Sequence, residues 1–174
     1  MRKLFIIDLK DYNPNGKKFY RPSVRGIIFD DNGDIAMIYS RKSHFYKFPG
    51  GGIEKNETHL ETLAREIKEE TGMTIIPESV KEFGEALKIQ KGDDVGEDII
   101  HIQQNFYYTC KVEKSVGKQS LDGNEKALDF VLKFVPIDEA IETNTAFKSD
   151  NPFEEQMAER DKRVLEIIKK FKRD

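Results

Sequence analysis

The chain has very little cysteine. Its 174 residues include one, Cys110, which excludes an internal disulfide and suits a reducing compartment. Cys110 stands in an apolar, aromatic run, so a buried core position is favoured over a nucleophile. No apolar run approaches the length of a membrane span, and the N-terminus lacks the pattern of a secretory signal. We therefore expect a soluble, cytoplasmic protein with no membrane partner.

The chain also lacks an excess of positive charge. It has 29 lysines and arginines against 32 acidic residues, a net charge of -3. This balance makes a nucleic-acid partner unlikely, because such binders usually show a basic footprint. There is no internal repeat, low-complexity tract or linker. We therefore expect one domain over residues 1–174, long enough for a substantial core.

The most informative stretch is a glycine-rich loop, residues 50–52, that runs into a predicted helix. Apolar residues recur at helical spacing and mark one buried face: Leu60, Leu63, Ala64, Ile67 and Thr71. Glu66, Glu69 and Glu70 also share a face, at spacings i, i+3 and i+4. Gly72 stands where a left-handed C-terminal cap belongs, and either Asn56 or Thr58 caps the start.

The charges of this helix are unfavourable for a purely structural element. Like charges one turn apart repel, and acids in the last turns oppose the helix dipole, each at a cost of a few tenths of a kcal/mol when exposed. A solvated acidic face is one interpretation. The other is a divalent cation held by carboxylates. A set of oxygen ligands without cysteine or histidine suits Mg²⁺ or Mn²⁺.

Written out with its gaps, the stretch resembles the signature of the Nudix hydrolase (MutT-like) family. Every fixed position is filled, in the pattern Gly51-x5-Glu57-x7-Arg65-Glu66-Ile67-x-Glu69-Glu70-x-Gly72-Met73. The resemblance implies an α/β/α sandwich with a mixed β-sheet, the motif helix on one face and a C-terminal helix packed on the sheet. It also implies metal-dependent hydrolysis of a phosphoric anhydride in a nucleoside diphosphate linked to another moiety.

The resemblance further implies roles for residues of the motif. Glu66, Glu69 and Glu70 would bind the metal, together with the backbone carbonyl of Gly50. Arg65 would orient a glutamate of the site through an ion pair. Glu66 or Glu69 would take the proton of the attacking water, and the residues leave this choice open. Gly51 and Gly52 would let the backbone approach substrate phosphate closely.

Three residues outside the motif are further candidates. Some family members supply another glutamate from a distant loop, as metal ligand or general base. Glu125 is the first candidate here and Glu97 the second, and a surface acid is the alternative for both. Arg41 follows a predicted strand close to the motif and is predicted to contact substrate phosphate, with a surface position as the alternative.

Periodicity and turn residues predict the surrounding elements. The predicted strands span residues 4–7, 20–29, 35–40, 46–48, 80–90, 99–112 and 128–135. A hairpin turn is predicted at residues 31–33, a helical turn at 136–141 and a final helix at 153–171. Residues 90–98 and 114–126 are predicted as polar loops.

The leading hypothesis is a pyrophosphohydrolase acting on a small nucleotide derivative with Mg²⁺ or Mn²⁺. The alternative is a non-catalytic nucleotide-binding module of the same fold, although the motif carboxylates are intact. An isomerase acting on diphosphates would require a catalytic cysteine, and an RNA-end hydrolase lacks a basic surface signal. The substrate's second moiety and the oligomeric state stay open, with a homodimer as one option.

Overall fold

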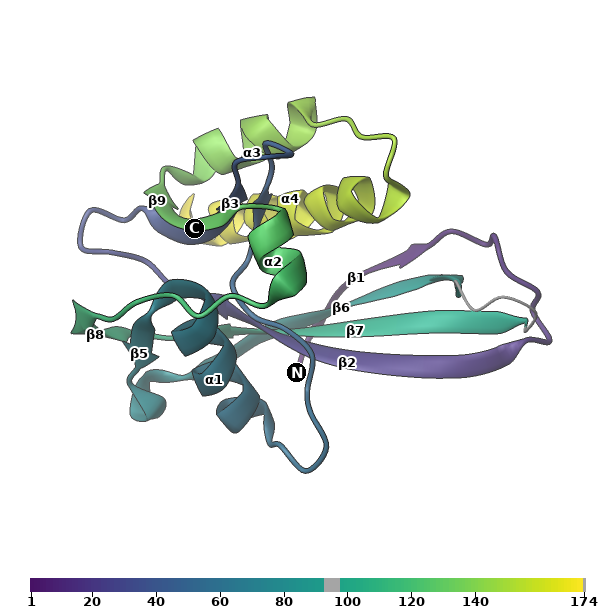
Figure 1. Ribbon diagram of the computed structural model, residues 1–174, viewed down its shortest axis with the longest axis horizontal. Helices are drawn as coiled ribbons and strands as arrows, with labels where there is room; N and C mark the ends of the chain where they lie inside the picture. Colours follow the sequence, from purple (N-terminus) through teal and green to yellow (C-terminus); the bar gives the residue numbers. More distant parts are fainter. Residues whose placement is uncertain (93–97, 174) are drawn as a thin grey trace.

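The computed structural model describes residues 1–92 and 98–173, and Figure 1 shows the arrangement of its elements. The strands are β1 (Lys3–Asp8), β2 (Lys17–Ile27), β3 (Ile35–Ser40), β4 (Tyr46–Lys47), β5 (Met73–Ile75), β6 (Lys81–Lys91), β7 (Ile99–Thr109), β8 (Val112–Val116) and β9 (Phe130–Val135). The helices are α1 (His59–Thr71), a 3₁₀ turn at Pro77–Ser79, α2 (Gly123–Ala127), α3 (Ile137–Ala146) and α4 (Pro152–Arg173).

Three small sheets form the β layer. The largest has the order β1-β6-β7-β2, with β1 parallel to β6, β6 antiparallel to β7 and β7 parallel to β2. The second is antiparallel, with the order β4-β3-β9, and the third pairs β5 with β8. Figure 1 shows β2, β6 and β7 extending together well beyond the helices.

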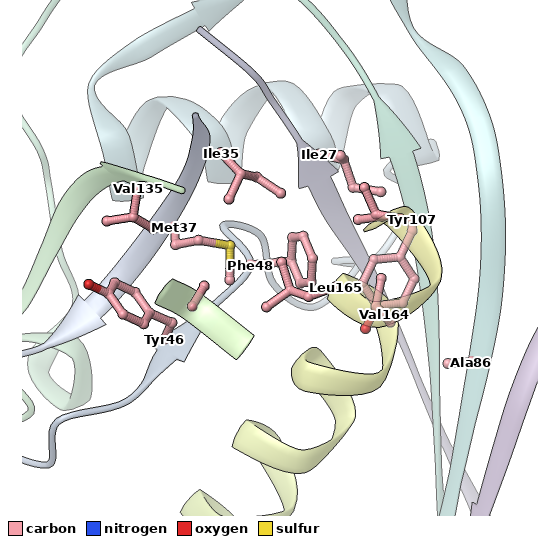
Figure 2. Packing of buried hydrophobic residues seen from close by; sticks show 12 residues of the cluster. Ile27, Ile35, Met37, Tyr46, Phe48, Ala86, Tyr107, Val135, Val164 and Leu165 are labelled. Atoms are coloured by element: carbon pink, nitrogen blue, oxygen red, sulfur yellow. The ribbon is translucent and has the colours of Figure 1, made fainter. Parts of the chain in front are cut away.

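Helices cover both faces of this layer. On one face, α1 packs Leu63 and Ile67 against Val24 and Ile28 of the β2 segment. On the other face, Val164, Leu165 and Ile168 of α4 join a cluster that includes Ile27 and Tyr107, which Figure 2 shows from close by. Side chains alternate between the faces of β2 because the strand has a period of two. The predicted α/β sandwich with a mixed sheet is therefore confirmed.

Helix α1 is held at both ends by side-chain and backbone caps. Thr58 is the N-cap and forms a capping box with Glu61, so Asn56 does not cap the helix. Gly72 ends the helix in the left-handed conformation, with φ of 74°, as predicted. Cys110 is buried, also as predicted, and burial raises the pKa of its thiol to about 12.

Four of the predicted elements need correction. Strand β3 meets the end of β2 at a single bridge, Phe29 to Ile35, and its main partners are β4 and β9 rather than β2. The strand predicted at 99–112 ends at Thr109, and β8 begins at Val112. Residues 137–146 form a full helix rather than one turn. The predicted loop at 90–98 lies partly outside the described residues, which omit 93–97.

The fourth correction concerns the predicted polar loop at 114–126, which contains the end of β8 and the short helix α2. Asp122 accepts a hydrogen bond from the Glu125 backbone N–H at 2.8 Å, and Glu125 Oε2 accepts one from the Asp122 N–H at 2.8 Å. This reciprocal pair is the geometry of a capping box. Its Asp-x-x-Glu spacing was present in the sequence as a helix-start signal.

None of the described helices is both long and apolar enough to cross a membrane.

Candidate active site

The glycine loop lies along the edge of β2. The Gly51 carbonyl accepts from the Val24 N–H and the Pro49 carbonyl from the Gly26 N–H, each at 2.9 Å. Gly50 has a φ of +132°, a backbone conformation that residues with a side chain rarely adopt. A Cβ added to Gly51 would lie 2.5 Å from the carboxylate of Glu66. The loop is therefore packed between the sheet and the acidic side of α1.

Glu70 is fixed inside this arrangement, and its side chain is 1% exposed. Its Oε2 accepts a hydrogen bond from the Gly50 N–H at 2.7 Å, and its Oε1 forms an ion pair with Lys47 of β4. A buried carboxylate needs such partners, because an unpaired buried charge is strongly destabilising. Lys47 therefore provides the positive charge beside Glu70 in this structure.

Arg65 connects the motif's acids to the loop. Its Nε donates to Glu57 Oε1 and its Nη1 to Glu66 Oε1, both at 2.7 Å. Its Nη2 donates to the Gly52 carbonyl at 3.2 Å. The guanidinium holds the pKa of Glu57 down at about 2. Burial is the main influence on Glu66 and raises the pKa of its carboxyl.

Glu125 reaches the same place from α2. Its carboxyl group lies close enough to that of Glu70 to influence its pKa. Burial first, and then this contact with Glu70, raise the pKa of Glu125 to about 7. The structure thus brings a residue 55 positions away from Glu70 in sequence into contact with it, although Glu125 lies in a short helix rather than in the predicted loop.

These groups line a groove of about 640 Å³. Its acidic side comes from the glycine loop, α1 and α2, and includes Glu66, Glu70 and Glu125. Its basic side comes from β2 and α4, and includes Arg21, Arg25 and Arg160. Gly50, Gly51 and Gly52 also line it, together with the exposed aromatic side chains of Phe19, Tyr20 and Phe153.

Three predicted site residues have other partners in this structure. The Glu69 side chain is 45% exposed, contacts Arg65 Nη1 at 3.2 Å and is not part of the described groove lining. Arg41 is also absent from that lining, and its guanidinium donates two hydrogen bonds of 2.8 Å to Asp129. The Gly50 carbonyl accepts a hydrogen bond from Arg25. Glu97 lies outside the described residues.

Several residues of the site were not predicted. Lys47 stands in a predicted strand directly before the loop, and its place next to a motif with four fixed glutamates was a usable signal. Ser23, Arg25 and Arg160 gave no local signal, because the strand and the helix that carry them meet only in the folded chain. His59 of α1 is also partly buried, since its Nδ1 lies 2.6 Å from the Tyr108 hydroxyl and its ring contacts that of Phe106.

The chain was compared with known families and proteins. The model of the NUDIX domain matches residues 19–158, which is well over half of the chain. The chain belongs to the Nudix hydrolase family. Nudix hydrolases generally use divalent metals and act on small nucleotide-derived substrates.

Two curated Nudix relatives differ in how much of the chain they match. An RNA pyrophosphohydrolase of Nitratiruptor sp. is 32% identical over 145 residues, covering 76% of this chain and 88% of that protein. An RNA pyrophosphohydrolase of Halorhodospira halophila is 41% identical over 54 residues only, 31% of this chain and 30% of that protein. The second match therefore spans less than a third of that relative's length.

A solved Nudix structure supports the fold. The Nudix hydrolase from Nitrosomonas europaea aligns with a TM-score of 0.53 and 16% identity, covering 82% of this chain and 89% of that chain. At this identity the likeness shows the shared fold only. The fold assignment thus rests on the sheet order and helix placement of this chain together with this neighbour.

The donor chemistry of this Nudix site fits a divalent metal. Glu66, Glu70 and Glu125 offer carboxylate oxygens, the donors that Mg²⁺ and Mn²⁺ prefer. Burial and the neighbouring Glu70 carboxyl group raise the pKa of Glu125, so two of these carboxyl groups lie close together. Within residues 1–92 and 98–173, no three acidic, histidine or cysteine side chains already stand at metal-binding positions.

Proposed function

We propose that this chain is a hydrolase dependent on Mg²⁺ or Mn²⁺, which cleaves the phosphoric anhydride bond of a nucleoside diphosphate linked to another moiety. The observation that carries the proposal is the meeting of Glu66, Glu70 and Glu125 in one groove beside the glycine loop. Membership of the Nudix family and the two pyrophosphohydrolase relatives support cleavage of a pyrophosphate bond.

In this proposal Glu66, Glu69 and Glu70 hold the metal, with the Gly50 carbonyl and Glu125 completing the set. A bound divalent cation would neutralise the pyrophosphate charge and lower the pKa of a coordinated water. Lys47 is the cationic partner of Glu70 in this structure, so the ion pair fixes that carboxylate next to the loop. Arg65 holds Glu66 in place through a hydrogen bond of 2.7 Å.

The chain's own residues then divide the remaining tasks. Glu66 or Glu69 accepts the proton of the attacking water, and Glu125 serves as a further ligand or base. Gly51 and Gly52 let the backbone approach the phosphates, because a glycine has no side chain of its own to keep a ligand away. Arg41 is proposed to contact substrate phosphate, which requires its guanidinium to exchange Asp129 for the substrate.

A second candidate substrate is the triphosphorylated 5′ end of an RNA. The 32% identity with the Nitratiruptor protein, an RNA pyrophosphohydrolase, over 76% of this chain favours it. The net charge of -3 weighs against extensive contact with an RNA backbone. The two candidates share the same chemistry at the phosphorus and differ only in the group attached to the nucleoside.

The test is a substrate panel with Mg²⁺ and with Mn²⁺, with the products identified by mass. It should include nucleoside triphosphates, ADP-ribose, a dinucleoside polyphosphate and a triphosphorylated RNA oligonucleotide. The proposal predicts metal-dependent cleavage between two phosphorus atoms of at least one of these compounds. If every compound survived with both metals, the chain would be a non-catalytic nucleotide-binding module instead.

A further inference from the structure

The floor of the groove is built from side chains that share one face of the large sheet. Arg21, Ser23 and Arg25 alternate along β2 and therefore point to the same side. In the β2–β7 register, Ser23 lies opposite Asn105. Arg160 of α4 lines the groove with Ser23 and Arg25. This basic floor lies next to the acidic residues but is formed by different elements.

The two buried guanidinium groups of this floor differ in their partners. Arg160 is 2% exposed and donates two hydrogen bonds to Asp161, at 2.7 and 3.0 Å. Arg25 is 6% exposed and, within the described chain, forms no ion pair within 4 Å. Its hydrogen bonds go to the Gly50 carbonyl and, at 3.5 Å, to Asn105 Oδ1. Arg25 thus has no direct carboxylate partner, although Asp161 and Glu70 act on its charge from a greater distance.

Two neutral donors in the same place also lack partners. The hydroxyl of Ser23 and the Nδ2 of Asn105 are buried and have no hydrogen-bond partner in the described part of the chain. The Oδ1 of Asn105 accepts from both Arg25 and Arg160, so its amide orientation is fixed by two guanidinium groups. Leaving a buried hydrogen-bond donor unpaired destabilises the fold by about 1–3 kcal/mol, and such unpaired donors are rare in natural proteins.

A negatively charged hydrogen-bond acceptor would pair with both the guanidinium groups and the unpaired hydrogen-bond donors. We propose that Ser23, Arg25 and Arg160 form an anion subsite in the groove floor, which binds a phosphate group of the substrate next to the pair whose bond is cleaved. Phosphate oxygens accept from a guanidinium fork and from a hydroxyl at once. Arg25 contacts Gly50, whose N–H is bonded to Glu70, so the subsite begins directly beside the acidic residues.

This inference rests on the proposed function and names its substrate class. A substrate with three phosphates in a row, a nucleoside 5′-triphosphate either free or at an RNA end, would fill both the acidic part and the floor. A nucleoside diphosphate sugar would place a neutral group against the guanidinium groups and leave the hydroxyl of Ser23 unpaired. The first class therefore fits the floor and the second does not.

The direct test is binding of inorganic tripolyphosphate in EDTA, measured by titration calorimetry on the whole chain. Wild-type protein is expected to bind it without metal. Ser23→Ala should weaken binding about 3- to 10-fold, the range for one hydrogen bond. Arg25→Gln should weaken it about 10- to 100-fold, the range for a hydrogen bond from a charged donor.

Ser40→Ala is the matched control. Ser40 is also fully buried, but its hydroxyl donates to the Leu128 carbonyl at 2.8 Å. This variant should lose thermal stability and keep tripolyphosphate binding, whereas Ser23→Ala loses no hydrogen bond and should keep or gain stability. Ser23→Ala thus tests the subsite even if Arg25→Gln fails to fold. Unchanged binding in Ser23→Ala, or no binding by wild-type protein in EDTA, would overturn the subsite.

Steady-state kinetics with metal present separate a free nucleoside triphosphate from an RNA end as the source of the phosphate chain. Ser23→Ala should raise KM about 3- to 10-fold for ATP or for a triphosphorylated RNA oligonucleotide, whichever wild-type protein hydrolyses, and leave KM for ADP-ribose unchanged. An equal rise for ADP-ribose would contradict the assignment. If wild-type protein binds tripolyphosphate but hydrolyses nothing, the proposed function fails while the anion subsite stands.

Discussion

The two sides of the groove gather opposite charges in different ways. On the acidic side, Glu66 and Glu70 come from one helix and the glycine loop directly precedes that helix. On the basic side, Arg25 and Arg160 come from a strand and a helix that are 135 positions apart in sequence. The acidic side is therefore readable from one continuous motif, whereas the basic side exists only after folding.

The two sides also differ in the charged groups that meet there and in the partners of those groups. Carboxyl groups of Glu70 and Glu125 meet at the acidic side, and Lys47 is the cation paired with Glu70. At the basic side, guanidinium groups and the unpaired hydroxyl of Ser23 meet, and Asp161 is already engaged by Arg160. In our proposals the first side binds a cation and the second an anion, so a metal-bound phosphate chain would occupy both.

Metal removal should separate the two sides most completely. EDTA should abolish hydrolysis, because in our proposal the acidic residues act through a bound cation that activates the attacking water. Added Mg²⁺ or Mn²⁺ should restore hydrolysis. Binding of tripolyphosphate at the basic floor should persist in the same EDTA buffer. Hydrolysis assays and calorimetry on one preparation measure both. Hydrolysis that continued in EDTA would contradict the assigned role of the carboxylates.

Glu70→Gln should have the next largest effect. Partners that only support metal ligands already change activity 10- to 100-fold, so loss of a ligand should lower kcat by more than about 10²-fold. The change also leaves Lys47 buried without its counter-charge, at a cost of about 3–5 kcal/mol. Thermal unfolding and steady-state kinetics measure the two effects.

The double variant with Lys47→Met and Glu70→Gln is the control for this prediction. It removes both buried charges, so much of the lost stability should return while turnover stays low. If the double variant instead regained activity, loss of folded protein and not loss of a ligand would explain the single variant.

Gly51→Ala should have a smaller effect than Glu70→Gln. The new Cβ would lie 2.5 Å from the Glu66 carboxylate, so that side chain must shift. A misplacement of about 1 Å can cost up to about 10²-fold in rate, and a 10- to 100-fold loss is expected here. Gly33→Ala is a suitable comparison, because that glycine lies in the β2–β3 turn and should affect stability only. Equal activity of Gly51→Ala and wild type would show that Glu66 does not need its present position.

The sequence predicted helix α1 because its signals are local. Gly72 as the C-terminal cap and the spacing of the carboxylates at i, i+3 and i+4 follow from helix geometry alone, whereas the choice of Thr58 over Asn56 as the N-cap needed the structure. Periodicity also located most strands and the final helix. It did not predict that β3 leaves β2 for β9, because pairing partners depend on tertiary packing rather than on the pattern within a strand.

Long-range contacts account for the rest. The contact of Glu125 with Glu70 depends on α2, whose Asp-x-x-Glu signal lay in a stretch interpreted as a loop. Arg25 looks like an ordinary polar position in a strand until α4 brings Arg160 beside the same Asn105. No local pattern carries that information.

The smallest expected effect concerns Glu57, the acid that fixes Arg65. Its pKa in the folded state is about 2, below the ordinary value of 4.5. A depressed pKa contributes stability above the unfolded pKa and loses it as the pH falls toward the folded value. The stability difference between wild type and Glu57→Gln should therefore be largest above pH 4.5 and shrink toward pH 2. Urea unfolding midpoints between about pH 6 and about pH 3 measure it, and a constant difference would argue against the ion pair with Arg65.

Mn²⁺ binding followed by electron paramagnetic resonance tests the central claim most directly, because it reports the cation without any substrate. The account predicts that wild-type protein binds Mn²⁺ and that Glu70→Gln and Glu125→Gln each bind it more weakly. Glu61→Gln, a change on the exposed side of α1, should leave the affinity unchanged. Equal Mn²⁺ affinity in all four proteins would contradict the assignment of a metal site to the acidic side of the groove.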